Sequence, residues 1–280
     1  MQFLESLKRT YTNNEYRLFL VIIYTLSFYG IYKIIVGDVS GWWLVLAFIW
    51  SKFVQFFGHT IGLHRYFTHK SFNTTPAKEK FLAWISIFLC VGSPIQYARN
   101  HRQHHKVSDQ PTDWHSPTND GKLRTMLGLW QFNSLSWYME RGGITPRDLI
   151  AHPTCRYIHN NYYKIWYSLL LVALIINPIV AIYLLALPGL LAHLDFNILT
   201  NCVGHTWGYR NFDTPDTSTN NSWANMIQWG EGLHNNHHAH PQLYDFAVKS
   251  NEFDFTALII KHYIAVDGAQ TRQGQLKIDQ

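Results

Sequence analysis

The chain has 280 residues, of which 47% are hydrophobic and only 15% are charged, against about 25% charged residues in a typical soluble domain. Its formal net charge is +5 and its pI is near 9.0, but no basic run interleaved with aromatic residues stands apart from the apolar segments, which argues against nucleic-acid binding. The three cysteines lack CxxC spacing, so neither a disulfide framework nor an iron–sulfur cluster is expected.

Long apolar runs predict an integral membrane protein built of helices, since a spanning helix needs about 20 apolar residues. The first two runs cover 17–36 and 41–62 and are joined by the short turn 37–40. The stretch 165–204 is long enough for two more spans, expected at 165–183 and 185–204, with a turn at Asn177-Pro178 or Pro188-Gly189. We therefore expect an all-α fold with four transmembrane helices in one domain, 1–280.

The apolar segment 81–92 is too short to cross a bilayer comfortably and is expected to form a buried or re-entrant helix. With four spans, Lys8, Arg9 and Arg17 lie on the same side of the membrane as the regions 64–160 and 205–280, which then form one helical cap. These regions carry many of the other Lys and Arg residues. The positive-inside tendency therefore places both termini and the cap in the cytoplasm.

Three histidine clusters lie between and after the apolar runs. Histidine is the commonest transition-metal ligand, and one ion takes three or four imidazoles, so we expect two ions in one cage. In the HxxHH pattern, positions i, i+3 and i+4 share one helix face and offer their ring nitrogens together. A span at 81–92 would separate the first cluster from the second. The clusters are His64 and His69; His101, His104 and His105; and His234, His237 and His238, with His205 closing the last apolar run.

Imidazole ligands suit iron, copper, zinc or nickel, so ligand type alone leaves the metal open. A cap resting on an apolar bundle is placed to act on lipid acyl chains. Removing hydrogen from an unactivated methylene needs a strong oxidant, which iron with dioxygen supplies and side chains do not. A histidine-rich metal transporter is the alternative from another class of protein, but transporters carry liganding groups within their spans.

These motifs resemble those of the membrane-bound fatty-acid desaturases, of the acyl-CoA and acyl-lipid type that act near the middle of the chain. The matching pieces are 62–72, 97–106, 201–208 and 230–238, in the same order and with fitting gaps. The resemblance implies a di-iron centre that uses dioxygen and two external electrons to place a cis double bond, at the delta-9 position, in a saturated acyl chain. A di-iron hydroxylase or ketolase is the alternative among enzymes.

The resemblance also implies the metal ligands, and it leaves open which ion each of them binds. His59 lies five residues before His64, as His69 lies five after it, but only His64 and His69 fit the HRxxxH pattern of the family. We expect His59 to be a helix residue with a polar partner. The implied ligands are His64, His69, His101, His104, His105, His205, His234, His237 and His238, with Asn201 acting through a water molecule.

Carboxylates near the clusters are expected to orient the ligand rings by accepting hydrogen bonds from their second nitrogens. Glu231, Asp109 and Asp113 are the nearest in sequence, and Asp213 and Asp216 are weaker candidates. His115, His152, His159 and His262 are expected to be solvated or hydrogen-bonded structural residues. His240 directly follows the third cluster and could support it.

Four residues are expected at the substrate mouth: Tyr97, Arg99, Arg102 and Lys106. The cations among them could bind a phosphate of coenzyme A or of a lipid headgroup, or contact the membrane surface. In the last apolar stretch, His193 and Asp195 either pair with each other or face the cavity.

The electrons are expected to come from a separate protein, because nothing in the sequence resembles a haem-binding or flavin-binding domain. A ferredoxin or a small haem cytochrome would dock on the basic cytoplasmic cap. The substrate is expected to be an acyl-lipid or an acyl-CoA. The basic cluster that holds coenzyme A in animal relatives is reduced here to Lys122 and Arg124.

Overall fold

The computed structural model describes residues 14–133 and 140–266. Within these residues the secondary structure is helical, and β-pairing is limited to three isolated bridges. The prediction of an all-α fold is confirmed for this part of the chain. Lys8, Arg9 and the end of the expected cap, 267–280, lie outside the described residues.

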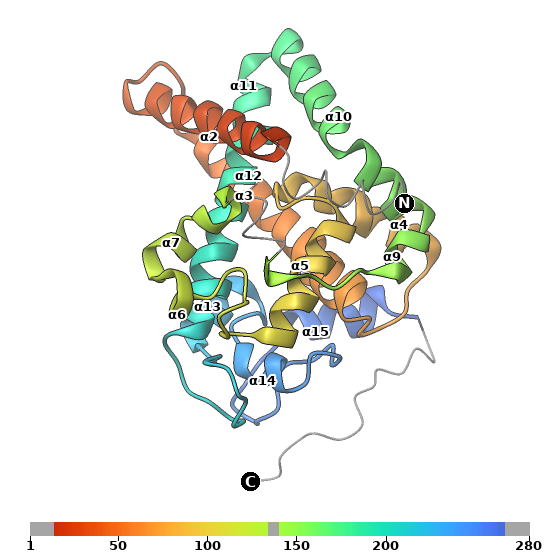
Figure 1. Cartoon of the computed structure of the whole chain (residues 1–280). Coiled ribbons are helices and arrows are strands. Elements are labelled where there is room, and N and C mark those ends of the chain that lie inside the picture. The colour runs from red at the N-terminus through yellow and green to blue at the C-terminus, as the bar shows by residue number, and fades with distance from the viewer. Residues whose placement is uncertain (1–13, 134–139, 267–280) are drawn as a thin grey trace.

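The first two predicted spans form two long helices joined by a short turn (Figure 1). Helix α2 covers Asn14–Ile35, and α3 (Trp42–Val54) continues into the π-helix η1 (Gln55–Thr68). Gly37 adopts a φ of 83° in the turn between them, a left-handed conformation that glycine tolerates best. The second apolar helix therefore extends from Trp42 to Thr68, beyond its predicted end at 62, and carries His64 in its last turns.

The boundaries predicted for the last two spans, 165–183 and 185–204, are wrong. Helix α10 covers Pro153–Ile176 and ends before Asn177. The side chain of Asn177 accepts a hydrogen bond from the Ile179 amide at 3.0 Å. Pro178 then starts a second helix, in whose first turn proline is readily accommodated because its missing amide hydrogen has no partner there. That second helix runs without a sharp break through α11 (Pro178–Val180), η4 (Ala181–Ala186), α12 (Leu187–Asp195), η5 (Phe196–Cys202) and η6 (Val203–His205).

The segment 81–92 lies in a bent helix pair. Helix α4 (Pro76–Ile85) starts at Thr75, whose hydroxyl accepts a hydrogen bond from the Lys78 amide, and α5 (Pro94–Val107) starts in the same way at Ser93. The 3-10 turn η2 (Ser86–Leu89) ends α4, and the two helices meet at 79°. Such a pair is either a broken span or a re-entrant loop. The prediction of a re-entrant helix is compatible with this geometry.

By length and composition, three helices of the described residues can cross a membrane, or four if the bent pair counts as one. They are Glu15–Ile35, Trp42–Thr68 and Pro178–His205. Helix α10 is not among them because polar residues such as Asn160, Asn161 and Lys164 occupy its first half. These helices fit an integral membrane protein with three or four spans. The predicted set of four spans, with α10 in one of them, stays a prediction.

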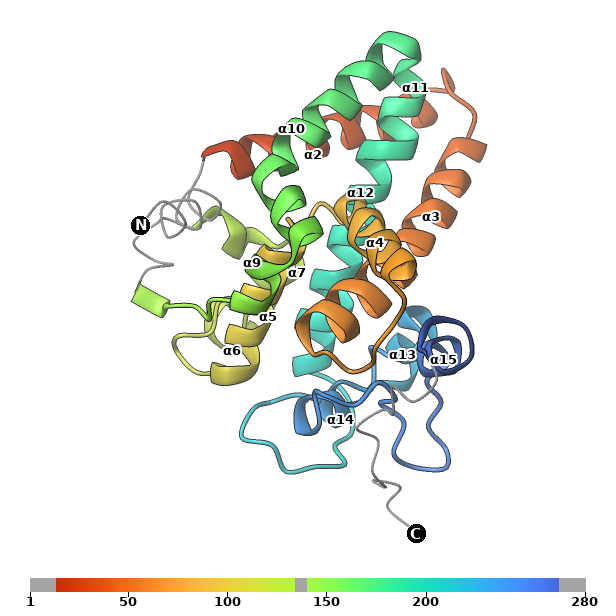
Figure 2. The same ribbon diagram turned by 90° about the vertical axis from the view of Figure 1, so that its right-hand side faces the viewer.

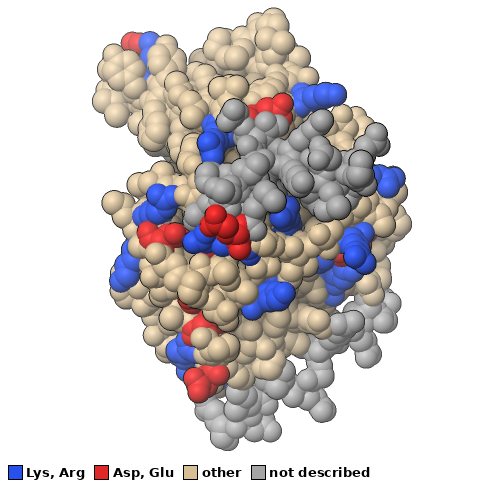
Figure 3. Space-filling view, viewed as in Figure 1, with Lys and Arg blue, Asp and Glu red and all other residues tan. Residues whose placement is uncertain are grey.

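Short helices form the other end of the molecule, below the long ones in Figures 1 and 2. Charged side chains on the face shown in Figure 3 gather over this lower body, with both signs interspersed, whereas the upper lobe is almost entirely uncharged. This division is expected where one end is embedded in lipid and the other meets water. The short elements are α6 (Pro117–Asp120), α7 (Lys122–Met126), η3 (Leu129–Phe132), α9 (Arg147–Ala151), α13 (Ser222–Gln228), α14 (His234–Ala239), α15 (Phe255–Ile259) and η7 (Ile260–Ile264).

Candidate metal centre

Nine histidines from distant parts of the sequence converge in two groups. They come from the end of η1, from α5, from η6 and from α14. Within each group the possible ligand atoms all lie within 4.8 Å of one another. The first group is His64, His69, His101, His105 and His237; the second is His104, His205, His234 and His238.

Each HxxHH motif divides its histidines between the two groups in the same way. On α5, His101 and His105 join the first group and His104 joins the second. On α14, His234 and His238 join the second group and His237 joins the first. Because each residue turns an α-helix by about 100°, positions i and i+4 lie about 40° apart while i+3 points about 60° to the other side. One helix therefore supplies both groups.

The ring nitrogens within each group point toward a common centre. The Nε2 of His237 lies 2.9 Å from the Nε2 of His64 and 2.9 Å from that of His105, which in turn lies 3.1 Å from the Nε2 of His101. In the second group the Nε2 atoms of His234 and His205 are 3.1 Å apart. Facing lone pairs repel one another unless a proton or a cation lies between them, so two adjacent metal ions fit this donor set.

Four carboxylates contact histidine rings of the two groups, each at the Nδ1 atom. Glu231 lies 2.5 Å from His64, Asp113 2.9 Å from His104, and Asp109 2.9 Å from His205. Asp216, only a weaker candidate from the sequence, lies 2.9 Å from the Nδ1 of His238. Such a contact fixes the ring orientation and leaves Nε2 free to bind a metal. Asp213, the other weaker candidate, is exposed on the same loop.

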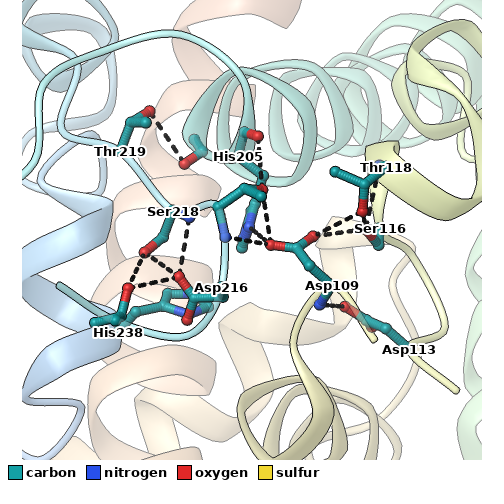
Figure 4. Close-up of polar contacts among 12 residues, drawn as sticks. Asp109, Asp113, Ser116, Thr118, His205, Asp216, Ser218, Thr219 and His238 are labelled. Carbon is teal, nitrogen blue, oxygen red and sulfur yellow. Dashed lines mark hydrogen bonds and ion pairs between the residues drawn. The ribbon is translucent and has the colours of Figure 1, made fainter. Parts of the chain in front are cut away.

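Asp109 also joins two loops beneath the second group (Figure 4). One carboxylate oxygen accepts hydrogen bonds from the backbone amide and hydroxyl of Thr217, both at 2.7 Å, and the other accepts one from the Ser116 hydroxyl at 2.5 Å. Burial favours the neutral acid, but these donors and His205 outweigh it and lower the pKa of Asp109. The carboxylate is therefore charged at neutral pH, as a partner of a metal-bound imidazole should be.

Arg65 is fully buried beside the first group, a feature that we did not predict from the sequence. Its guanidinium donates to Asp254 at 2.7 Å, to Glu231 at 3.2 Å and to the backbone oxygen of Tyr244 at 2.6 Å. It also lies 3.8 Å from the ring centre of Phe246. Through Glu231 it supports the His64 ring. The only signal in the sequence is that an arginine directly follows a cluster histidine.

Asn201 and His59 lie near the histidine groups but in different settings. Asn201 is buried about one turn before His205, and its amide nitrogen donates to the side-chain oxygen of Asn197 at 3.1 Å. His59 belongs to neither group, and its Nε2 lies 2.9 Å from the hydroxyl of Tyr97. His59 therefore has the polar partner that its buried position requires.

His115 differs most from its expected environment. It is 3% exposed, its ring centre lies 4.4 Å from that of His104, and with His104 and Asp113 it forms a third group of possible ligand atoms. This contact could not be predicted from the sequence, because His115 belongs to no cluster. His240, in contrast, packs its ring on Phe212 outside all three groups.

A pocket beside the first group has about 510 Å³ of empty space, part of it open to solvent. His101, Tyr97, Trp130 and Tyr16 are among its lining residues. A second pocket of about 340 Å³ shares Val91 and Phe196 with the first and reaches Glu231. The two pockets are therefore adjacent, and both lie beside the first histidine group.

The residues expected at the substrate mouth have separate environments. Tyr97 lines the first pocket, and Lys106 is exposed on α5. Arg102 is bound within the protein, since it donates twice to Asp148 and also to two backbone oxygens of η1. Arg99 lies over the ring of Trp114, 5.6 Å from its centre. A role of any of them in phosphate binding stays a prediction.

His193 and Asp195 do not pair with each other. Asp195 forms an ion pair with Lys52 at 2.7 Å and accepts a hydrogen bond from Gln228 at 3.1 Å. Asp195 also lines the second pocket. His193 is fully buried, with its ring centre 6.0 Å from that of Tyr24.

Comparison with known proteins identifies the family. The fatty acid desaturase family matches this chain over residues 40–265, a range that holds every histidine of both groups. The chain belongs to this family. One relative is a protein of Arabidopsis thaliana described as a probable chloroplastic lipid desaturase, which is 29% identical over 80% of this chain and 62% of its own length.

Other relatives are named for different double-bond positions. An acyl-CoA C20 delta-5 desaturase of Anemone leveillei is 31% identical over 73% of this chain and 65% of its own length. An sn-1 stearoyl-lipid 9-desaturase of Anabaena variabilis is 32% identical over 65% of this chain and 66% of its own length. The chain thus spans about two thirds or less of the length of these three relatives.

Replacing a carboxylate behind a ligand ring should weaken metal binding without removing a ligand. We expect Asp113→Asn and Asp216→Asn each to lower metal affinity by about 10–100-fold, since an amide accepts from the imidazole without a compensating charge. Titration of metal-depleted protein against a chelator of known affinity would measure the change. Asp213→Asn is the matched control on the exposed loop, and equal weakening there would contradict a specific role for Asp113 and Asp216.

Proposed function

We propose that the chain is an oxygen-dependent fatty-acyl desaturase that introduces a cis double bond into a saturated acyl chain. The observation that carries this proposal is the pair of adjacent histidine groups beside a pocket, in a member of the fatty acid desaturase family. The balanced reaction consumes the saturated chain, one dioxygen, two electrons and two protons, and yields the alkene and two waters.

Two iron ions would supply the oxidising power with dioxygen. We propose that His64, His69, His101, His105 and His237 hold one ion, and that His104, His205, His234 and His238 hold the other. Asn201, about one helical turn before His205, completes the second set through a water molecule. Glu231, Asp109, Asp113 and Asp216 keep the rings oriented and charge-compensated. These assignments are supported by the convergence of the ring nitrogens and by the four Nδ1 contacts.

The protein would hold the acyl chain in a fixed position relative to the metal ions. An acyl chain in the first pocket would pass Tyr97 and His101, next to the first histidine group. Tyr97 is held in place by its hydrogen bond with His59, and such fixed walls decide which carbons face the reactive centre. Because the relatives are named for different positions, the family leaves the position open. We propose delta-9, as in the Anabaena relative.

We propose an acyl-lipid or acyl-CoA as substrate, in line with the substrates named for the relatives. The two electrons would come from a ferredoxin or a small haem cytochrome docking on the lower body. We further propose that this body forms a cytoplasmic cap belonging to one domain, 1–280, in an integral, multi-pass membrane protein. The excess of Lys and Arg over Asp and Glu in the chain, 23 against 18, supports contact with an acidic donor.

Fatty-acid profiling of a desaturase-deficient host that expresses the chain tests the proposal. We expect a new cis-monoene, whose double bond mass spectrometry would place at carbon 9. Co-expression of a ferredoxin, and separately of a haem cytochrome with its reductase, ensures that a missing donor is not mistaken for inactivity. Hydroxylated or keto fatty acids would assign the chain to the rival oxygenases. No new product with either donor would sink the desaturase proposal.

A further inference from the structure

Two short helices of the lower body turn apolar side chains outward. On α13, Trp223, Met226 and Ile227 recur at i, i+3 and i+4 and are 52%, 80% and 40% exposed. On α15, Phe255 and Leu258 are 37% and 44% exposed. Contiguous apolar patches are uncommon on surfaces that face only water. We call these residues, together with Phe253, the α13–α15 face.

Two polar contacts join α13 and α15, so that the α13–α15 face forms one surface. The side chain of Asn225 on α13 donates to the backbone oxygen of Phe253 at 2.8 Å, and the amide of Thr256 on α15 donates to the backbone oxygen of Trp229 at 2.9 Å. The opposite sides of both helices are buried, through Ala224 on α13 and Ala257 on α15. Both helices therefore have a fixed orientation, with their apolar residues outward.

This face lies next to the exposed apolar surface of α3, which belongs to one of the helices that could cross a membrane. On α3, Phe48, Ile49 and Phe53 are 52%, 60% and 39% exposed. Beyond α3, the ring of Phe56 lies 5.2 Å from that of Trp229 and 5.8 Å from that of Phe255. Figure 2 shows α13 and α15 together just beyond the lower end of α3. The exposed apolar surface of α3 and the α13–α15 face are thus adjacent, with the buried ring of Phe56 between them.

A cation and an aromatic ring lie where α3 meets the α13–α15 face. Lys52, near the end of α3, pairs with Asp195, and its ammonium lies 5.6 Å from the ring centre of Trp229. Lysines and tryptophans placed in this way are typical of the boundary between acyl chains and headgroups. On η7, which directly follows α15, Lys261 and His262 are exposed and can contact lipid headgroups.

We propose that α13 and the helix Phe255–Ile264 lie in the interfacial layer of the bilayer, with the α13–α15 face toward lipid. Short helices with one apolar and one polar side bind membranes in this orientation. Asp254 caps α15 by accepting from the Ala257 amide at 3.0 Å and also pairs with Arg65, which directly follows His64. The membrane contact is therefore tied by two residues to the first histidine group. This inference does not depend on the reaction.

Spin labels on the face test the inference in vesicles of neutral and anionic phospholipid that contain the full chain. Nitroxides would be attached at Met226→Cys and Leu258→Cys, with Ile49→Cys as the lipid reference and Asp213→Cys as the aqueous reference. The three native cysteines are buried, and labelling of the unsubstituted chain measures their background. Collision rates with oxygen and with a water-soluble nickel complex report the depth of each label.

We expect the ratio of oxygen to nickel collisions at residues 226 and 258 to exceed that at 213 several-fold and to lie below that at 49. Ratios equal to that at 213 would overturn the proposal. Labels that are shielded from both agents and coupled to each other, with coupling lost on dilution with unlabelled chain, would instead assign the face to a second copy. Thermal stability equal to that of the unsubstituted chain would confirm that the variants are folded.

Discussion

His237→Ala and His238→Ala should each abolish formation of the unsaturated product, although the two residues are neighbours that serve different histidine groups. The first change leaves four imidazoles in its group and the second leaves three. We expect fewer than two irons per chain in both variants, because metal affinity depends on the full ligand set. Fatty-acid profiling and metal analysis of the purified proteins measure the two effects.

His240→Ala is the matched control for this pair. His240 follows on the same short segment, but its ring packs on Phe212 outside the histidine groups. The variant should keep its iron and its product. If His240→Ala lost as much iron as the other two, or if His237→Ala remained fully active, the assignment of ligands to two ions would be wrong.

Arg65→Met should destabilise the folded chain by about 3–5 kcal/mol, the usual cost of removing one partner from a buried ion pair. The change leaves Glu231 and Asp254 buried, at 2% and 5% exposure, without their shared cation. Burial already raises the pKa of both carboxyls, and Arg65 opposes that rise. In detergent, we expect the midpoint of thermal unfolding to fall by about 10 °C.

Two further variants separate the lost charge from lost packing. Arg65→Met combined with Asp254→Asn should recover part of the stability, because asparagine still caps α15 and carries no charge. Lys33→Met removes a cation from an exposed pair with Asp38 and should leave the midpoint unchanged. Equal losses for Arg65→Met and Lys33→Met would show that the buried pairs do not stabilise the fold.

Much of the site could be predicted because short sequence motifs encode it. The nine histidines that come together are the ones that the clusters and His205 indicate, and Glu231, Asp109 and Asp113 are close to them both in sequence and in space. Asp216 was harder to place, because its contact with His238 depends on how the loop after His205 folds back. The contacts of Arg65 and His115 were not predicted, because Glu231 and Asp254 are remote from Arg65 in the sequence and His115 belongs to no cluster.

The fold was predicted in class and missed in detail. Apolar length locates the first two spans, but it cannot find a helix end inside a continuous apolar stretch. Asn177-Pro178 and Pro188-Gly189 are equally good breakers by composition, yet only the first ends a helix. Pro188 instead lies within the continuous helix Pro178–His205, shortly after the π-helix η4. Local π-turns and neighbouring helices commonly accommodate a proline in this way. Likewise, the sequence alone does not predict which apolar residues of α13 and α15 are exposed, because this depends on which side of each helix is buried.

The division of each HxxHH motif between two groups has a consequence for assembly. Since α5 and α14 each serve both groups, an ion bound in one of them restrains the helices that form the other. The second ion then binds to helices that the first ion has already ordered, so its binding costs less conformational entropy. Metal uptake is therefore expected to be cooperative. Iron titrated into metal-free chain should accordingly produce empty and doubly filled molecules, with singly filled ones scarce.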